Sequence, residues 1–171
     1  MPSHQSPCRL CGHSAIFFVT RKERQYERCI RCGFIQVSLS DLPTHQEEHQ
    51  EYLLHENNPN QLGYRRFLSP ITNLAIKWLQ SQSPDPIRIL DFGAGSGQAV
   101  AVILSESGWC VDNYDPIFGP PELPPKKTVD LLICTEVVEH FHHPKNDWAI
   151  IFELLSNRGL ALIMTEWSDP H

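Results

Sequence analysis

Glycine recurs at alternate positions shortly after an acidic residue in the middle of the chain. Residues 87–97 read Ile-Arg-Ile-Leu-Asp-Phe-Gly-Ala-Gly-Ser-Gly, so an apolar run ends in Asp91 and passes at once into a glycine-rich turn. Glycine has no Cβ and lets the backbone approach a ligand closely, and a carboxylate at a strand end accepts hydrogen bonds from ribose or amine groups. The stretch predicts a nucleotide-binding turn, with an ordinary strand-to-helix loop as the alternative.

A second acidic residue follows the turn at a spacing that nucleotide-binding folds use. Residues 109–114 are predicted to form a strand that ends at Asp115, eighteen residues after Gly97. Nucleotide folds place a ribose-binding carboxylate about 20 residues after the glycine turn. Asp112 is the competing acid, but it lies inside the strand, and the carboxyl ends of the strands line the binding crevice. Asp115 is therefore the preferred candidate.

Four of the six cysteines form two Cys-x-x-Cys pairs near the N-terminus, each followed by glycine. Two such pairs supply four thiolates for a tetrahedral zinc ion and leave no open coordination position, so the predicted role is structural. A redox-active pair is the rival reading for any single Cys-x-x-Cys, and disulfides are less favoured because no secretory signal opens the chain. The pattern predicts a zinc-ribbon-like module over residues 1–40, with the ligands Cys8, Cys11, Cys29 and Cys32.

A polar, histidine-rich stretch over residues 41–69 is predicted to be a helical connector. Thr44 and Glu47 fit a capping box, so a helix is expected to begin there and to run to about Glu56. If the connector folds over the glycine turn, three residues just before Pro59 would touch a bound ligand. They are His55, Glu56 and Asn57.

Helices and strands alternate along the rest of the chain, which predicts parallel strand pairing and a doubly wound sheet. A helix is expected to start with Ser69 as N-cap and Pro70 in its first turn. Apolar runs at residues 129–134 and 160–165 predict further strands, and the helix between them is expected to end in a C-cap at residues 157–159. Cys110 and Cys134 are interpreted as buried apolar residues inside strands.

Four segments in this order resemble class I S-adenosylmethionine-dependent methyltransferases. They are the turn at residues 89–97, the Tyr-Asp-Pro at residues 114–116, the Asp-Leu-Leu-Ile-Cys-Thr-Glu-Val-Val-Glu-His at residues 130–140, and the Arg-Gly-Leu-Ala-Leu-Ile-Met-Thr at residues 158–165. The resemblance implies an α/β fold with a Rossmann-like, doubly wound and mostly parallel sheet over residues 70–171, beside the small N-terminal ribbon. The chain stops at His171, where the family continues, so a C-terminally truncated and incomplete domain is expected.

The resemblance also implies a cofactor site. Asp91 and the backbone of the turn would surround the methionine part of S-adenosylmethionine, Asp115 would bind both ribose hydroxyls, and two residues after the next strand would lie beside the cofactor. The proline-rich residues 117–128 stand where the family has its third strand, so no adenine contact is named. The implied cofactor-binding residues are Asp91, Gly93, Ala94, Gly95, Gly97, Asp115, Thr135 and Glu136.

To catalyse methyl transfer, a protein mainly has to align the methyl donor with the acceptor. It must also remove a proton when the nucleophile is oxygen or carbon. Glu136, Glu139 and His140 stand at i, i+3 and i+4, which would put them on one face of a helical turn. His140 is the candidate general base because its ordinary pKa is near neutrality, with Glu139 beside it. The same pattern resembles the metal site of some magnesium-dependent O-methyltransferases, including small-RNA enzymes, and this alternative stays open.

The composition limits the classes of partner that this chain is expected to bind. The net charge is -6, which argues against nucleic acid as the default partner, and no apolar run approaches the ~20 residues that a bilayer requires. A cytoplasmic methyltransferase that uses S-adenosylmethionine, structural zinc and a small-molecule acceptor is expected. The alternative is a non-catalytic zinc-ribbon adaptor with a degenerate methyltransferase scaffold.

Overall fold

The computed structural model describes residues 6–53, 57–83, 85–119 and 122–166. The chain forms two compact units. The first lies within residues 1–54 and 142–148, and the second within residues 55–141 and 149–171. The predicted division into residues 1–40, 41–69 and 70–171 stays a prediction.

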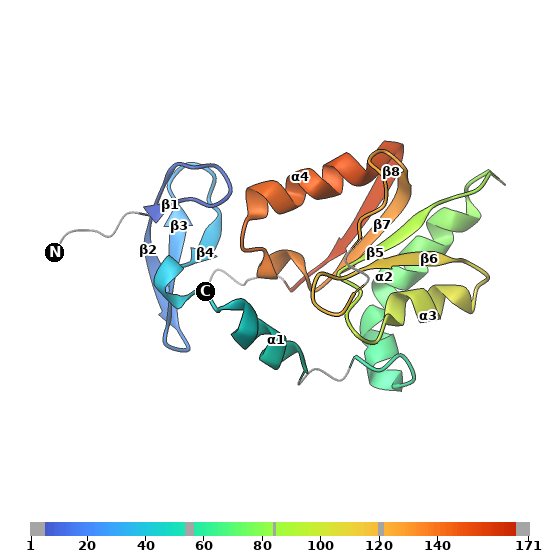
Figure 1. Ribbon diagram of the computed structural model, residues 1–171, viewed down its shortest axis with the longest axis horizontal. Helices are drawn as coiled ribbons and strands as arrows, with labels where there is room; N and C mark the ends of the chain where they lie inside the picture. The colour runs from blue at the N-terminus through green and yellow to red at the C-terminus, as the bar shows by residue number, and fades with distance from the viewer. Residues whose placement is uncertain (1–5, 54–56, 84, 120–121, 167–171) are drawn as a thin grey trace. The chain divides into compact units, whose positions relative to one another are not determined.

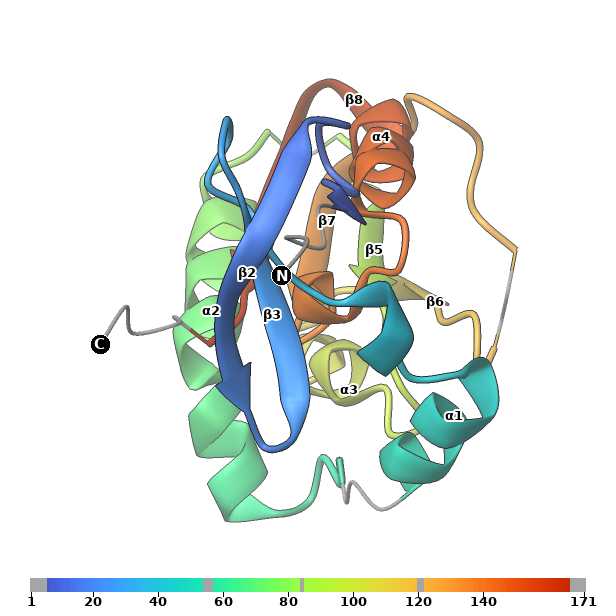
Figure 2. The ribbon, with the colours of Figure 1, turned by 90° about the vertical axis from the view of Figure 1, so that its left-hand side faces the viewer.

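A small antiparallel sheet makes up most of the first unit. Its strands follow one another in chain order: β1 (Ser6–Pro7), β2 (Ser14–Arg21), β3 (Arg24–Cys29) and β4 (Ile35–Val37). Lys22 and Glu23 both have positive φ, as a tight two-residue hairpin requires, and Figure 2 shows β2 and β3 as one long hairpin. The structure confirms the small ribbon-like module that the cysteine spacing predicted.

Helix α1 (His45–Leu53) follows the ribbon after a short 3-10 helix, η1 (Leu39–Asp41). The predicted capping box is confirmed: the backbone N–H and the hydroxyl of Thr44 both donate to Glu47 Oε2 at 2.8 Å, and Glu47 N–H donates to the Thr44 hydroxyl at 3.3 Å. The predicted end of this helix at Glu56 lies outside the described residues.

The second unit is built on a four-stranded parallel sheet in the order β6-β5-β7-β8. Figure 1 shows α2 and α3 on one face of this sheet and α4 on the other, which confirms the Rossmann-like α/β fold. The elements are α2 (Leu62–Gln80), β5 (Ile89–Phe92), α3 (Ala99–Ser105), β6 (Val111–Tyr114), β7 (Val129–Thr135), η2 (Val138–His140), α4 (Pro144–Leu154) and β8 (Leu155–Met164).

The main core lies between the sheet and helices α2 and α3. Alternate side chains of β5, β7 and β8 point to this face, because successive strand residues point to opposite faces. They pack against the apolar stripe of α2, and burial of this area is the main source of stability in the unit. The buried cluster comprises Leu68, Ile71, Ala75, Leu79, Ile89, Ala99, Val100, Leu104, Leu131, Ile133 and Leu162.

The strand order creates a switch point at the carboxyl end of β5. The chain passes from β5 to β6 on one side and then returns to β7 on the other side. In open parallel sheets, ligands bind in the crevice at such a point. Asp91, the glycine turn and the residues after β7 all lie at this edge of the sheet.

Helix α2 begins eight residues earlier than the sequence predicted. The expected N-cap at Ser69 is wrong, since α2 starts at Leu62 and contains Pro70 in its interior. Proline has no N–H to donate to the carbonyl four residues earlier, that of Arg66. The Ser69 hydroxyl donates to this carbonyl at 2.8 Å, so the helix continues without an unsatisfied acceptor.

Two further local predictions are wrong. Residues 157–159 lie inside β8 rather than in a C-cap, and Gly159 does not have a positive φ. A Cβ on Gly159 would lie 2.7 Å from the Val129 carbonyl oxygen, so close strand packing explains this glycine. Cys110 precedes β6 and is exposed, whereas Cys134 is fully buried in β7 as predicted.

Candidate functional site

The glycine turn after β5 is closed by hydrogen bonds to the neighbouring strand. The N–H groups of Gly93 and Ala94 donate to the Tyr114 carbonyl at 2.8 and 3.1 Å. Gly93 has a φ of +82°, and a Cβ there would lie 2.4 Å from Val137 Cγ2. Both the backbone conformation and the lack of space therefore require glycine at this position.

Asn57 packs directly on the same turn. A Cβ on Gly97 would lie 2.0 Å from the Asn57 carbonyl oxygen, and one on Gly95 would lie 3.7 Å from Asn57 Nδ2. Of the three connector residues expected near a ligand, Asn57 thus reaches the turn, while His55 and Glu56 lie outside the described residues. Gly97 has no side chain and therefore lets the backbone of Asn57 pack closely against the turn.

Asp115 connects the turn to the end of β6. Its Oδ2 accepts the Gly95 N–H at 2.8 Å, and its Oδ1 accepts the N–H groups of Ile117 and Phe118 at 2.8 and 2.9 Å. A carboxylate has about four lone-pair sites, so roughly one stays open to a further donor. The competing acid, Asp112, instead receives the Arg88 guanidinium at 2.8 Å near the start of β5.

Asp91 is an acidic side chain that is almost completely buried beside the turn. It is 1% exposed, and its Oδ1 has no hydrogen-bond partner among the described residues. Burial, with the nearby Asp115 carboxylate, raises the pKa of Asp91 to about 7. A buried oxygen without a partner is costly, and a donor or cation bound at the turn would satisfy it.

The surroundings are completed by the predicted Glu136 and by two groups that the sequence did not point to, Tyr64 and Glu166. Tyr64 of α2 is half-buried, and burial together with Asp91 and Glu136 raises its pKa. Burial and the Glu139 and Glu166 carboxylates raise the pKa of Glu136. Tyr64 and Glu166 come from elements distant in the sequence, so no local spacing could reveal them.

The predicted helical face after β7 is wrong. Thr135 ends β7, Glu136 has a φ of +52°, and only residues 138–140 form a short 3-10 turn. Glu136 is thus outside any helix, although its side chain still shares a hydrogen bond with Glu139. Glu139 and His140 are exposed. The carboxylates are brought together by a turn rather than by helical periodicity.

The four cysteines converge in the first unit. Their sulfur atoms all lie within 4.8 Å of one another, with Cys11 and Cys29 3.5 Å apart and Cys8 and Cys32 3.7 Å apart. A tetrahedral site with zinc–sulfur bonds of about 2.3 Å places its sulfurs about 3.8 Å apart. Among the described residues, this is the one group of three or more potential ligands close enough to share an ion, so Glu136, Glu139 and His140 do not form a second.

The electrostatics of the cluster also suit a cation. Hydrogen bonds from the N–H groups of Cys32 and Arg31 lower the pKa of Cys29 to about 6. The pKa of Cys32 is raised to about 12, with burial and the neighbouring thiols Cys11, Cys29 and Cys8 outweighing a backbone hydrogen bond at Phe34. Four thiols this close cannot all ionise by themselves, whereas a divalent cation stabilises the thiolates together.

Comparison with known families agrees with the fold and the turn. Residues 62–171 match a family model described as a methyltransferase domain, and this match covers well over half of the chain. The chain therefore belongs to this methyltransferase family. No curated protein matches it in a sequence search. In the part of the chain that the structure describes, no helix combines the length and the apolar character needed to cross a membrane.

Proposed function

We propose that this chain is an S-adenosylmethionine-dependent methyltransferase whose cofactor binds at the turn after β5. The observation that carries the proposal is Asp91, a buried carboxylate at the switch point of the sheet whose Oδ1 has no partner within the described part of the chain. Membership of the methyltransferase family supports it. The cofactor supplies a methyl group on a positively charged sulfonium.

Asp91 would bind the ammonium group of the cofactor. A cofactor ammonium would satisfy its free oxygen and favour its ionised form, because an opposite charge nearby lowers the pKa of a carboxyl group. The backbone of Gly93, Ala94 and Gly95 would hold the same end of the ligand, and Gly97 keeps the turn closed against Asn57.

Asp115 would bind the ribose of the cofactor, and Thr135 and Glu136 would lie beside the cofactor. Asp115 already accepts three backbone N–H groups, so it would accept one ribose hydroxyl without losing them. Thr135 ends β7, the strand on the other side of β5, and Glu136 follows it, so both would flank the ligand there.

Methyl transfer needs an acceptor held in line with the departing sulfur. We assign His140, with Glu139 beside it, to remove a proton from the acceptor; both side chains are exposed and so are accessible to a substrate. The net charge of -6 supports a small-molecule acceptor over nucleic acid. A cytoplasmic location belongs to the same proposal.

Zinc is the metal we assign to the cysteine cluster. The sulfur separations fit a four-sulfur tetrahedron, and such a site has no open position for catalysis. The role of the ion would be to hold the ribbon together. Elemental analysis of the purified chain should give one zinc per chain, and its absence would remove this assignment.

A thermal-shift experiment tests the cofactor. At 100 times its dissociation constant, S-adenosylmethionine or S-adenosylhomocysteine should stabilise the chain by about 2.7 kcal/mol. For a chain of this size the corresponding rise in Tm is roughly 5–10 °C. No rise at millimolar concentrations of either compound would contradict the proposal and would favour the non-catalytic adaptor.

A further inference from the structure

The first unit contains a short segment that belongs, in sequence, to the methyltransferase domain. Residues 142–148 fall into the same compact unit as the ribbon and α1. They follow directly on the turn at residues 136–141, which carries Glu136, Glu139 and His140. The position of this segment therefore determines where one end of that turn is held.

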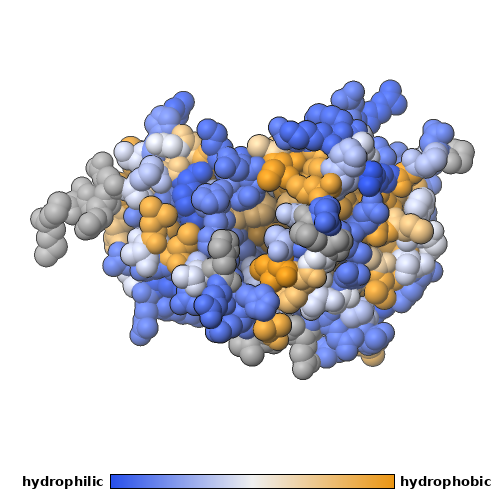
Figure 3. All heavy atoms as spheres, viewed as in Figure 1, coloured by the Kyte–Doolittle hydropathy of each residue, from blue (hydrophilic) through white to orange (hydrophobic). Residues whose placement is uncertain are grey.

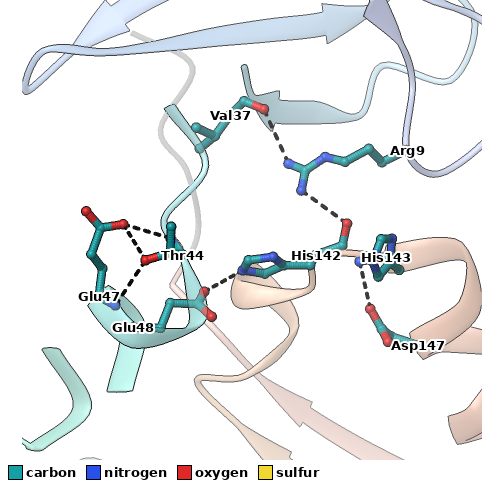
Figure 4. Close-up of polar contacts among 8 residues, drawn as sticks. All are labelled: Arg9, Val37, Thr44, Glu47, Glu48, His142, His143 and Asp147. Carbon is teal, nitrogen blue, oxygen red and sulfur yellow. Dashed lines mark hydrogen bonds and ion pairs between the residues drawn. The ribbon is translucent and has the colours of Figure 1, made fainter. Parts of the chain in front are cut away.

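His142 is bound from two directions within this unit, as Figure 4 shows. Its Nε2 lies 2.7 Å from Glu48 Oε1 of α1, and the two side chains are only 20% and 11% exposed. Its carbonyl oxygen accepts a hydrogen bond from Arg9 Nη1 at 3.3 Å. A charge-assisted contact that is largely withdrawn from water is stronger than one on the open surface.

Arg9 is itself held by the ribbon. It lies between Cys8 and Cys11, its N–H donates to Gln36 Oε1 at 2.8 Å, and its Nη2 donates to the Val37 carbonyl at 3.4 Å. The cysteine knuckle therefore sets the backbone from which the guanidinium reaches His142. Any metal that fixes the knuckle fixes this reach as well.

The segment after His142 is stiffened locally. The N–H of His143 donates to Asp147 Oδ2 at 3.1 Å, and the N–H groups of Asn146 and Asp147 donate to the His143 carbonyl. His143 thus occupies the N-cap of α4, with the buried Pro144 at the first helical position, where proline is favoured. These hydrogen bonds tie His143 to the first turn of α4.

The other end of the turn is held by the parallel sheet. Glu136 N–H donates to the Met164 carbonyl of β8 at 2.8 Å, and His140 N–H closes the 3-10 turn on the Val137 carbonyl at 3.0 Å. The turn is therefore held at its start by the hydrogen bond to β8, and His142, which is bound by Glu48 and Arg9, follows it directly in the chain.

We propose that the cysteine-bearing unit positions the 136–141 turn by holding His142, so that Glu48 and Arg9 are positioning residues for the turn that carries Glu139 and His140. This gives the ribbon a role in the reaction beyond holding its own fold. The functional consequence rests on the proposed methyltransferase activity, whereas the mechanical coupling does not.

Hydrogen–deuterium exchange on the full-length, metal-loaded chain tests the coupling. In Glu48→Gln the amides of residues 137–143 should exchange about tenfold faster than in the wild type, the effect of losing one charged hydrogen bond. Glu51→Gln is the matched control, because it makes the same charge change at an exposed position of the same helix, and it should leave the exchange unchanged. The amides of β5 and β7 should be unaffected in both.

Two further measurements separate positioning from a general loss of stability. Arg9→Lys keeps the charge and loses the forked donor, and should accelerate exchange of the same amides, while Arg31→Lys in the other knuckle should not. The ring signals of His140 in a proton–carbon NMR spectrum should move in Glu48→Gln but not in Glu51→Gln, with Tm equal in the two variants.

Wild-type exchange rates at residues 137–143 in both Glu48→Gln and Arg9→Lys would overturn the proposal. Titration of the wild type with S-adenosylhomocysteine is an independent test of the proposed function. Absence of binding would overturn the proposed function, while the exchange experiment would still decide whether the two segments are coupled.

Discussion

The cysteine cluster and the glycine turn are both tight-turn sites, but they obtain their order from different sources. Around the cysteines, the buried apolar residues of the ribbon are Cys8, Ala15 and Cys29, while Phe17 and Ile30 are 60% and 68% exposed. Figure 3 shows orange, apolar patches on the surface of the ribbon unit. The glycine turn instead follows β5, whose four residues are all buried.

The two sites also differ in what they leave open. The four cysteines could fill all four positions of a tetrahedral ion, whereas the glycine turn keeps one buried carboxylate oxygen without a partner among the described residues. A site that lacks a core must be completed by its ion in order to fold, while a site supported by a core can carry an unsatisfied group. The first therefore suits a structural role and the second suits ligand binding.

Removal of the metal should have the largest effect. Structural zinc sites contribute about 10–16 kcal/mol of apparent binding free energy, so the ribbon should lose its fold when the ion is removed or Cys29 is changed to Ser. Hydrogen exchange should show β2 and β3 unprotected while β5 and β7 keep their protection. Equal protection of the ribbon with and without metal would contradict a metal-dependent fold.

Alanine substitutions at two glycines with positive φ separate the cost of steric crowding from the cost of backbone strain. A Cβ on Gly93 (φ +82°) would collide with Val137, whereas a Cβ on Gly12 (φ +77°) would meet no atom within 4 Å. Gly93→Ala should destabilise the parallel-sheet unit by about 2–5 kcal/mol, from left-handed strain and overpacking together. Gly12→Ala should cost only about 1–2 kcal/mol. Denaturant unfolding measures both, and equal costs would show that contact with Val137 does not matter.

The two acids of the β6 region offer a second matched pair. Asp115→Asn should cost about 1–3 kcal/mol, since one of its oxygens becomes a donor and buried N–H groups lose their acceptor. Asp112→Asn should cost less than about 1 kcal/mol, because the side chains of its ion pair with Arg88 are 55% and 41% exposed. Calorimetry should also show weaker S-adenosylhomocysteine binding in the first variant alone. Equal affinities in the two would remove Asp115 from the site.

Asp91→Asn should stabilise the ligand-free chain by about 1–2 kcal/mol at pH 8. Burial and Asp115 raise the pKa of Asp91 to about 7 in the folded state, well above its ordinary value. Ionisation therefore lowers the stability of the wild type as the pH rises from about 4 to about 7, and the asparagine removes this penalty. Unfolding at pH 8 and pH 5 should show a smaller difference at pH 5. A variant less stable than the wild type at pH 8 would contradict the raised pKa.

Local chemistry made much of the fold predictable. The cysteine spacing led to the ribbon, and the run before Asp91 led to β5, because each depends on residues close in sequence. Proline misled where a nearby hydroxyl replaced its missing donor, as Ser69 does for Pro70. Gly159 resembled a helix cap, although its reason is the carbonyl of Val129 on the neighbouring strand.

Parts of the candidate site depend on contacts between residues far apart in the sequence. Asp91 contributes to the raised pKa of Tyr64 on α2, and Glu48 contacts His142 across 94 residues of chain. No periodicity or motif records such pairs, since they exist only once the sheet and the ribbon have folded. The spacing of Glu136, Glu139 and His140 indicated proximity, but a left-handed residue at Glu136 replaced the expected helix.

Calorimetric titration of the full-length, metal-loaded chain with S-adenosylhomocysteine tests the proposed cofactor site most directly. We expect one-to-one binding in the wild type, with an affinity that rises as the pH increases from about 6 to about 8, because an ionised Asp91 attracts the ligand's ammonium group. In Asp91→Asn the binding should be weaker and independent of pH over this range. Equal affinity and equal pH dependence in the two proteins, or no binding to the wild type at millimolar ligand, would contradict it.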